Sequence, residues 1–104
     1  MEKYTIKISL SASGDLKQIA LYMRNVLKVP NTARNYLKLL RQEINKLAIL
    51  PNRHEIIEKE KIEQSNVRKL IVKNYIIFYI VDDEKKIVNV ERILYGASNW
   101  IDKI

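Results

Sequence analysis

The sequence predicts an α+β protein in which two helices pack on one face of a small sheet dominated by antiparallel strands. Three patterns predict this class. The first residues of the chain alternate between apolar and polar side chains, as a half-buried strand does. The middle carries two apolar stripes at helical spacing, and the last third carries three runs rich in Val, Ile, Tyr and Phe. The predicted element order is βααββββ.

The N-terminal half divides into one strand and a helical hairpin. Lys3–Leu10 forms the alternating strand, and Ser11–Asp15 offers turn residues and an N-cap for the helix that follows. Apolar residues recur at helical spacing over Leu16–Leu27 and again over Ala33–Ala48. Val29–Thr32 breaks the first helix and can cap the second. A connection this short predicts an antiparallel hairpin.

Three strands are predicted in the last third of the chain. Asn74 separates the run Val67–Lys73 from the run Tyr75–Val81, and a charged turn at Asp82–Lys86 leads into Ile87–Tyr95. The middle run, YIIFYIV, has no polar alternation. This pattern predicts a central strand that is covered on both faces.

The stretch between the helices and these strands is the least regular part of the sequence. Pro51-Asn52 ends the second helix. We expect a short strand near His54–Ile57 and a solvated loop at Glu58–Lys61. Ala97–Ile104 is interpreted as a tail or a final half-turn.

Length and composition exclude several classes of protein. At 104 residues the chain forms a single domain over residues 1–104. It has no cysteine, which excludes disulfides and thiol chemistry, and its single histidine argues against a zinc site. No apolar stretch reaches the roughly 20 residues of a membrane span, and the N-terminus lacks the form of a signal peptide. We therefore expect a cytoplasmic protein with no membrane partner and no cofactor.

The net charge of +7 is concentrated in the N-terminal half. Residues 1–54 hold 10 Lys and Arg against 3 Asp and Glu, whereas residues 55–104 hold 9 of each kind. This asymmetry predicts a nucleic-acid or acidic protein partner, and the alternative is an ordinary solvated helix surface. The basic residues expected to supply the positive field are Lys17, Arg24, Lys28, Arg34, Lys38, Arg41 and Lys46.

The C-terminal segment VRKLIVKNYIIFYIVDDEKKIVNVERILYG, residues 67–96, carries a specific succession of motifs. An Arg-Lys-hydrophobic strand leads to Asn-Tyr, an aromatic-rich strand, an acidic turn and an Arg-hydrophobic-Leu-Tyr-Gly ending. Together with the helix ending KLAILPNR at residues 46–53 and the predicted topology, it resembles the RelE/ParE superfamily of bacterial type II toxins. The resemblance covers nearly the whole chain.

The resemblance implies a toxin that is neutralised by an antitoxin encoded beside it, in a hetero-oligomer. RelE-like members cleave mRNA in the ribosomal A site, whereas ParE-like members share the fold and inhibit DNA gyrase. We expect an mRNA endoribonuclease that needs the ribosome and no metal, with the ribosome, mRNA and an acidic antitoxin as partners. The alternatives are a gyrase inhibitor and a module that only binds its antitoxin.

RNA cleavage without a metal requires a base for the 2′-OH proton, an acid for the leaving oxygen, and cations that stabilise the phosphorane. The resemblance assigns phosphate binding to Arg68, because its planar fork can bind phosphate through two hydrogen bonds. The alternative is a surface arginine paired with an acid such as Glu91. Tyr95 can donate a proton or stack on a base, and its alternative is a half-buried tyrosine at a strand end.

Arg92 is a further catalytic candidate at the end of the last strand. The expected alternation places it on one strand face with Val88, Val90 and Leu94. That position favours a structural role, in which the stem packs and the charged head reaches water.

Other candidates lie in less regular places. His54 and Glu55 occupy the region where some relatives place a general base, and the alternative is an exposed loop pair. Lys69 and Lys73 are expected on one strand face, where they can touch backbone phosphate. Trp100 can stack on a base, although packing of the tail onto the sheet is the favoured interpretation.

One departure from the family pattern affects the choice of activity. Relatives with this ending commonly carry an Arg pair and an acid after the glycine. Here Gly96 is followed by Ala97-Ser98-Asn99-Trp100. The missing charges weaken the nuclease hypothesis and leave the gyrase inhibitor, or a degenerate toxin, open.

Overall fold

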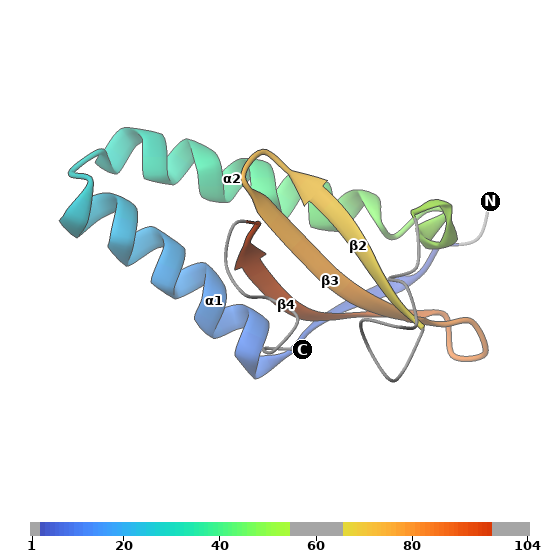
Figure 1. Cartoon of the computed structure of the whole chain (residues 1–104). Helices are drawn as coiled ribbons and strands as arrows, with labels where there is room; N and C mark the ends of the chain where they lie inside the picture. Colours follow the sequence, from blue (N-terminus) through green and yellow to red (C-terminus); the bar gives the residue numbers. More distant parts are fainter. Residues whose placement is uncertain (1–2, 55–65, 97–104) are drawn as a thin grey trace.

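The computed structural model describes residues 3–54 and 66–96. The element order is β1 (Thr5–Ile8), α1 (Leu10–Leu21), a π-helical turn η1 (Tyr22–Val26), α2 (Pro30–Lys46), a 3-10 turn η2 (Pro51–Arg53), β2 (Val67–Val72), β3 (Tyr75–Asp82) and β4 (Ile87–Tyr95). These strands form one sheet in the order β1-β4-β3-β2, in which β1 is parallel to β4 and the other pairs are antiparallel. Figure 1 shows α1 and α2 as a hairpin beside the sheet. The predicted α+β class is confirmed.

The boundary between the first strand and the first helix differs from the prediction. The strand expected to reach Leu10 ends at Ile8, and α1 begins at Leu10. Ser9 is the N-cap rather than a residue of Ser11–Asp15, because its Oγ accepts a hydrogen bond from the backbone N–H of Ala12 at 3.0 Å. Leu10, expected on the buried strand face, is consequently 93% exposed.

The hairpin closes over fewer residues than Val29–Thr32. Pro30 is the first residue of α2, where its missing N–H costs no helical hydrogen bond. The turn is made before it: Lys28 takes a left-handed backbone, with φ of 55°, and the N–H of Val29 donates to the carbonyl of Met23 at 2.9 Å. In Figure 1 the closed end of this hairpin extends beyond the sheet.

Some predicted elements fall outside the described residues. His54 itself follows η2 in a bend with extended backbone, and the rest of the short strand expected near His54–Ile57 lies outside the described residues. The expected loop at Glu58–Lys61 and the tail Ala97–Ile104 also lie outside them.

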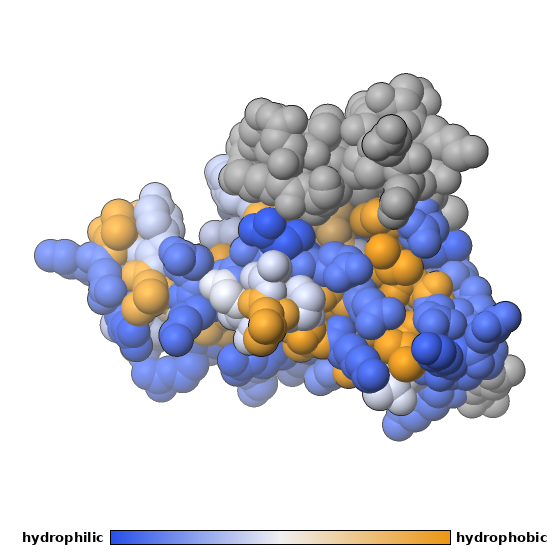
Figure 2. All heavy atoms as spheres, turned by 90° about the horizontal axis from the view of Figure 1, so that it is seen from below, coloured by the Kyte–Doolittle hydropathy of each residue, from blue (hydrophilic) through white to orange (hydrophobic). Residues whose placement is uncertain are grey.

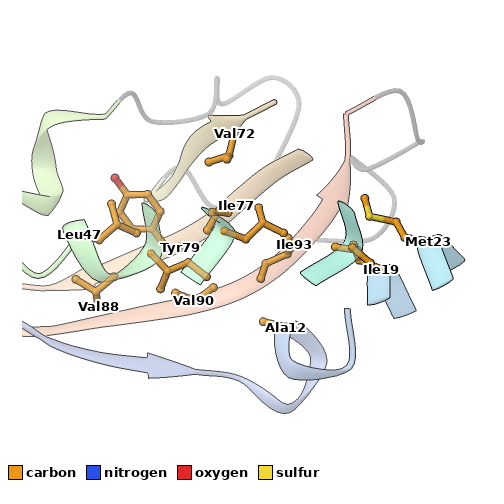
Figure 3. Packing of buried hydrophobic residues seen from close by; sticks show 13 residues of the cluster. Ala12, Ile19, Met23, Leu47, Val72, Ile77, Tyr79, Val88, Val90 and Ile93 are labelled. Atoms are coloured by element: carbon orange, nitrogen blue, oxygen red, sulfur yellow. The ribbon is translucent and has the colours of Figure 1, made fainter. Parts of the chain in front are cut away.

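Strand β3 is buried on both faces, as its unbroken apolar run predicted. Ile77 and Tyr79 belong to the main core, which the helices share with the sheet (Figure 3). Ile76 and Phe78 form a second cluster with Leu94. Because successive side chains of a strand point to opposite faces, the two clusters lie on opposite sides of the sheet.

A bulge interrupts the pairing of β3 with β4. Phe78 pairs with Arg92 and the next residue, Tyr79, pairs with Val90, so Glu91 is an extra residue in β4. The bulge exchanges the faces of the residues that follow it. This shift determines where the last predicted site residues point.

No helix in the described parts of the chain is both long and apolar enough to span a membrane.

Candidate functional site

Arg68 lies near the start of β2, opposite Tyr79 of β3. Its Nη1 donates hydrogen bonds to the carbonyl oxygens of Asn52, at 3.1 Å, and His54, at 2.6 Å. These acceptors are main-chain atoms and not the carboxylate of Glu91. A guanidinium has five N–H donors, so Nε and Nη2 keep the capacity to bind an anion. Arg68 therefore holds the segment after α2 against the sheet without using all of its donors.

The same segment is fixed by the ring of Tyr79. The fully buried hydroxyl of Tyr79 donates to the carbonyl of Pro51 at 2.7 Å, and the ring of His54 meets the Tyr79 ring edge-on at 6.3 Å. Leu50, just before Pro51, adopts a left-handed backbone with φ of 52°, which is strained for a non-glycine residue. We call the segment 50–54, with Arg68 and Tyr79, the loop end of the sheet.

A carboxylate ties the β3–β4 turn to the loop end. Asp83 Oδ1 accepts hydrogen bonds from the hydroxyl of Tyr4 at 2.7 Å and from Nδ2 of Asn52 at 3.1 Å. These bonds, first that of Tyr4 and then that of Asn52, lower the pKa of Asp83, and the bond to Asp83 raises the pKa of Tyr4. Lys86 Nζ lies 5.2 Å from the centre of the Tyr4 ring. The loop end is therefore a connected polar network.

Arg92 is committed to Asp15 of α1. Its Nε and Nη2 donate to the two carboxylate oxygens at 2.8 and 3.0 Å, and the backbone N–H of Ile93 donates to the same carboxylate at 2.9 Å. The bond to Asp15 raises the pKa of Arg92. The predicted shared face with Val88 and Val90 is wrong, because the bulge moves Arg92 to the opposite face. The structural role favoured from the sequence fits this pairing, which fastens α1 to β4.

Tyr95 stands at the other end of the sheet, among tyrosines. It pairs with Tyr75 across β3 and β4, and the two rings meet at 5.7 Å and 66°. Tyr75 also meets Tyr36 of α2 at 5.5 Å and 79°. The Tyr36 hydroxyl accepts a hydrogen bond from the N–H of Asn74 at 3.1 Å. Three tyrosines thus form an edge-to-face chain, in an arrangement favoured by the ring quadrupoles.

These tyrosines line a cavity of about 740 Å³ between the helical hairpin and the sheet. Tyr22 of η1 is the fourth tyrosine of its wall, beside Met23 and Leu27. Burial raises the pKa of Tyr75, and the neighbouring tyrosines raise it further. We call the cavity, with Tyr22, Tyr36, Tyr75 and Tyr95, the tyrosine pocket.

The loop end and the tyrosine pocket lie at opposite ends of the strands. Arg68 pairs with Tyr79, whereas Tyr95 pairs with Tyr75, which in turn pairs with Val72. The four residues from position 68 to position 72 span about 13 Å of strand. The structure therefore brings Arg68 and His54 together but separates both from Tyr95, so these three cannot act on the same phosphate.

The predicted basic residues of the helical hairpin are all exposed. Lys46 forms an ion pair with Glu43 at 2.7 Å. For the six others the structure shows no ion pair with any described residue: Lys17, Arg24, Lys28, Arg34, Lys38 and Arg41. Figure 2 shows how hydrophilic side chains cover much of one face, with a hydrophobic patch at the closed end of the hairpin.

The remaining candidates are dispersed. Lys69 lies half-buried in β2, but Lys73 belongs to the β2–β3 turn, with φ of 56°. The shared strand face predicted for these lysines is therefore wrong at Lys73, because the strand ends at Val72. Glu55 and Trp100 lie outside the described residues. Within residues 3–54 and 66–96, no three His, Asp or Glu side chains are grouped to hold a metal ion.

Two features of the site were missed from the sequence. Asp15 was taken as a turn residue and Tyr36 as part of an apolar helical stripe. The concentration of four of the six tyrosines at one end arises from α2, η1 and two strands together. The only signal in the chain was the tyrosine content itself, which says nothing about where the rings meet.

A family model identifies the family of this chain, and solved structures share its fold. The family model described as the ParE toxin of the type II toxin-antitoxin system parDE matches residues 6–100. The fold is similar to a chain of the chromosomal ParDE system from P. aeruginosa, with a TM-score of 0.73 and 20% identity over 89% of this chain and 96% of that one. It is similar to a chain of the RelBE2 toxin-antitoxin complex from Mycobacterium tuberculosis, with a TM-score of 0.71 and 19% identity over 94% and 97%. The search of curated proteins gives no match.

Proposed function

We propose that this chain, which belongs to the ParE toxin family of type II toxin-antitoxin systems, inhibits growth by cleaving mRNA on the ribosome, and that a cognate acidic antitoxin holds it inactive. The observation that supports cleavage is the loop end. There Arg68 is fixed by two carbonyl oxygens, one of which belongs to His54. A cation and an imidazole on one rigid support are two of the groups that RNA cleavage needs.

In this proposal the free donors of Arg68 bind the scissile phosphate. His54 takes the proton of the 2′-OH, whose oxygen attacks the adjacent phosphorus while the bond to the 5′-oxygen breaks. The products are a cyclic phosphate and a 5′-hydroxyl. The leaving 5′-oxygen then takes a proton from solvent or from the imidazolium that His54 has become, and Glu55 is the alternative general base. The polar network of Asn52 and Asp83 positions this segment, so that little reorganisation is needed when RNA binds.

The antitoxin is expected to bind through an acidic segment that becomes ordered on the toxin. The helical hairpin carries six cations with no ion pair to a described residue, while its two carboxylates are taken up by Arg92 and Lys46. Such a field accelerates association with an acidic partner. Charge reversal at Arg34, Lys38 and Arg41 should slow association more than it changes dissociation. An association rate that does not respond to salt would contradict this electrostatic account.

A second function, inhibition of DNA gyrase, is favoured by a specific observation. Arg92 is paired with Asp15, and Tyr95 stands about 13 Å of strand away from Arg68, so the candidate catalytic groups do not form one cluster. An inhibitor that acts by binding its target needs no such cluster.

One experiment separates the two functions. The chain is induced in culture, and mRNA 5′ ends and plasmid supercoiling are measured in the same cells. Cuts in frame with codons that disappear in Arg68→Ala would support cleavage, with Lys7→Gln on β1 as the control. Intact mRNA with altered supercoiling and a DNA-damage response would overturn cleavage in favour of gyrase inhibition. Unchanged growth with both measurements normal would leave only an antitoxin-binding module.

A further inference from the structure

The tyrosine pocket has the composition of a binding site for a planar ring. We propose that it binds the base of an unpaired nucleotide, with the sugar-phosphate chain extending toward the exposed cations of the helical hairpin. The loop end takes no part in this proposal, because it lies at the opposite end of the sheet. The inference therefore goes beyond the proposed function and holds whether or not the chain cleaves RNA.

The rings of the pocket are already arranged for stacking. Tyr36, Tyr75 and Tyr95 are held edge-to-face at 5.5 and 5.7 Å, while Tyr22 and Tyr95 each remain 50% exposed. Exposed tyrosine faces beside a cavity can stack on a base, which contributes binding free energy with little regard to sequence. The cavity of about 740 Å³ falls within the range of sites that bind small molecules.

The pocket is rigid on its strand side because Asn74 is held by both of its main-chain groups. Its N–H donates to the Tyr36 hydroxyl at 3.1 Å, and its carbonyl accepts from the N–H of Gly96 at 2.8 Å. A Cβ at Gly96 would lie 3.3 Å from that carbonyl oxygen, so glycine permits this close approach. On the helix side the π-helical turn closes through the Leu27 N–H and the Tyr22 carbonyl, at 3.1 Å.

The pocket also offers groups that can hydrogen-bond to the edge of a base. Gln18 and Asn74 are among the residues that line it, and a side-chain amide has both a donor and an acceptor. The Tyr75 hydroxyl is protonated at neutral pH, as that of an ordinary tyrosine is, and can therefore donate. The carboxylate in the wall, Asp15, is already bound by Arg92 and the N–H of Ile93, so its charge is compensated.

Four cations are sequence neighbours of residues in the pocket wall. Lys17 precedes Gln18, Arg24 follows Met23, Lys28 follows Leu27, and Lys73 precedes Asn74. All four cations are exposed, and the structure gives none of them an ion pair with a described residue. Exposed cations with no ion pair to a described residue attract an anionic chain, and its binding should be salt-dependent.

An acidic peptide with an apolar side chain is the other ligand that matches the charge. The exposed Val26 and Leu27 at the hairpin tip would suit it. The four tyrosine rings and two amides favour the nucleotide, because a purely aliphatic anchor would leave those polar groups without partners. The peptide is therefore treated as an outcome of the test.

The test uses the full-length chain and a short fluorescein-labelled RNA whose 2′-hydroxyls are methylated, so that cleavage by 2′-OH attack is impossible. Binding is followed by fluorescence anisotropy. Tyr22→Leu, which removes a half-exposed ring, should weaken binding roughly five- to a hundredfold, as expected for the loss of one stacking partner. Tyr4→Leu, the same change at the loop end, should alter the affinity by less than about twofold.

Two further variants make the result decisive. Tyr36→Phe keeps the ring and should bind far better than Tyr36→Leu, after circular dichroism has shown that both are folded. Lys28→Gln should reduce the slope of log affinity against log salt by about one, whereas Lys7→Gln on β1 should leave it unchanged. The proposal is overturned if Tyr22→Leu and Tyr36→Leu bind the RNA like the wild type. The proposal is also overturned if the wild type does not bind the RNA. In that case, a labelled acidic peptide that contains leucine, and that loses affinity in the same variants, would be the ligand instead.

Discussion

The two ends of the sheet differ in the kinds of side chains that they carry, although β2, β3 and β4 run through both. The loop end is a polar network in which Arg68, Tyr79 and Asp83 hold a strained segment by its carbonyls and amide. The tyrosine pocket is a hollow between the helical hairpin and the sheet, with four tyrosines in its wall. One end fixes a few groups in place, and the other leaves room for a ligand.

This contrast shows how a small domain can separate two tasks. A hydrogen-bonded network of short contacts can position an arginine and a histidine for a reaction on phosphate. A preformed aromatic cavity can bind a ring without being part of that reaction. The stiff, doubly covered strand β3 connects the ends, so each can be altered while the other keeps its geometry.

The largest expected effect is at the loop end. Arg68→Ala should lower the rate of mRNA cleavage on the order of a hundredfold, because losing a phosphate-binding cation is comparable to losing one oxyanion donor, about 2–4 kcal/mol of barrier. The rate is measured per folded molecule, because Arg68 also holds the carbonyls of Asn52 and His54. Arg68→Lys should retain part of the activity. A loss of less than about threefold would place the active site elsewhere.

The next effect concerns the fastening of the hairpin to the sheet. Asp15→Ala should lower the free energy of unfolding by about 2 kcal/mol, because it removes the bidentate contact with Arg92 and the acceptor of the Ile93 N–H. Urea denaturation measures the loss. Glu43→Ala is the matched control, since its pair with Lys46 is exposed and should contribute less than about 1 kcal/mol. Equal decreases in the free energy of unfolding in the two variants would show that the contact of Asp15 with β4 does not stabilise the packing of α1 on the sheet.

A smaller effect is expected inside the loop end. Tyr79→Phe removes the buried hydroxyl that donates to Pro51 and should cost about 1–2 kcal/mol of stability, because the carbonyl loses its partner. The affinity of the tyrosine pocket for the methylated RNA should not change. Thermal unfolding and anisotropy measure the two quantities in the same samples. A parallel loss of RNA affinity would mean that the two ends are coupled.

The smallest effect is a dependence on pH. The folded protein lowers the pKa of Asp83, so this carboxylate contributes stability above its ordinary pKa near 4, and the contribution is lost as the pH falls through the lowered value. The wild type should therefore exceed Asp83→Asn in Tm at pH 7, and the difference should vanish at strongly acidic pH. A difference that grows as the pH falls would contradict the hydrogen bonds assigned to Asp83.

The sequence predicted the fold class because its periodic patterns report which face of an element is buried. The unbroken run of β3 correctly indicated a strand covered on both faces, and the charged turn before Ile87 was confirmed. The predicted ends of the helices were less accurate, because a single residue can determine where a helix begins. Ser9 caps α1 by one hydrogen bond, and Pro30 begins a helix that it was expected to precede.

The site was harder to predict because it depends on register and on contacts between distant segments. One extra residue, Glu91, reverses the face on which Arg92 lies, and no pattern in β4 reveals a bulge. Arg68 and Tyr95 are both at strand ends, but antiparallel pairing places those ends on opposite sides of the sheet. The tyrosine pocket joins Tyr22 to Tyr95, 73 positions apart in the chain.

The separate roles proposed for the two ends are tested most directly by the rate of ribosome-dependent mRNA cleavage. This rate is measured as a function of the concentration of mRNA-programmed ribosomes. Four proteins are compared: the wild type, Arg68→Ala, Tyr22→Leu and the double variant. We expect Arg68→Ala to lower the maximal rate roughly a hundredfold at unchanged half-saturation, and Tyr22→Leu to raise the half-saturating concentration at unchanged maximal rate. The double variant should combine both effects independently. Absence of cleavage by the wild type, or loss of the same parameter in both single variants, would contradict the account.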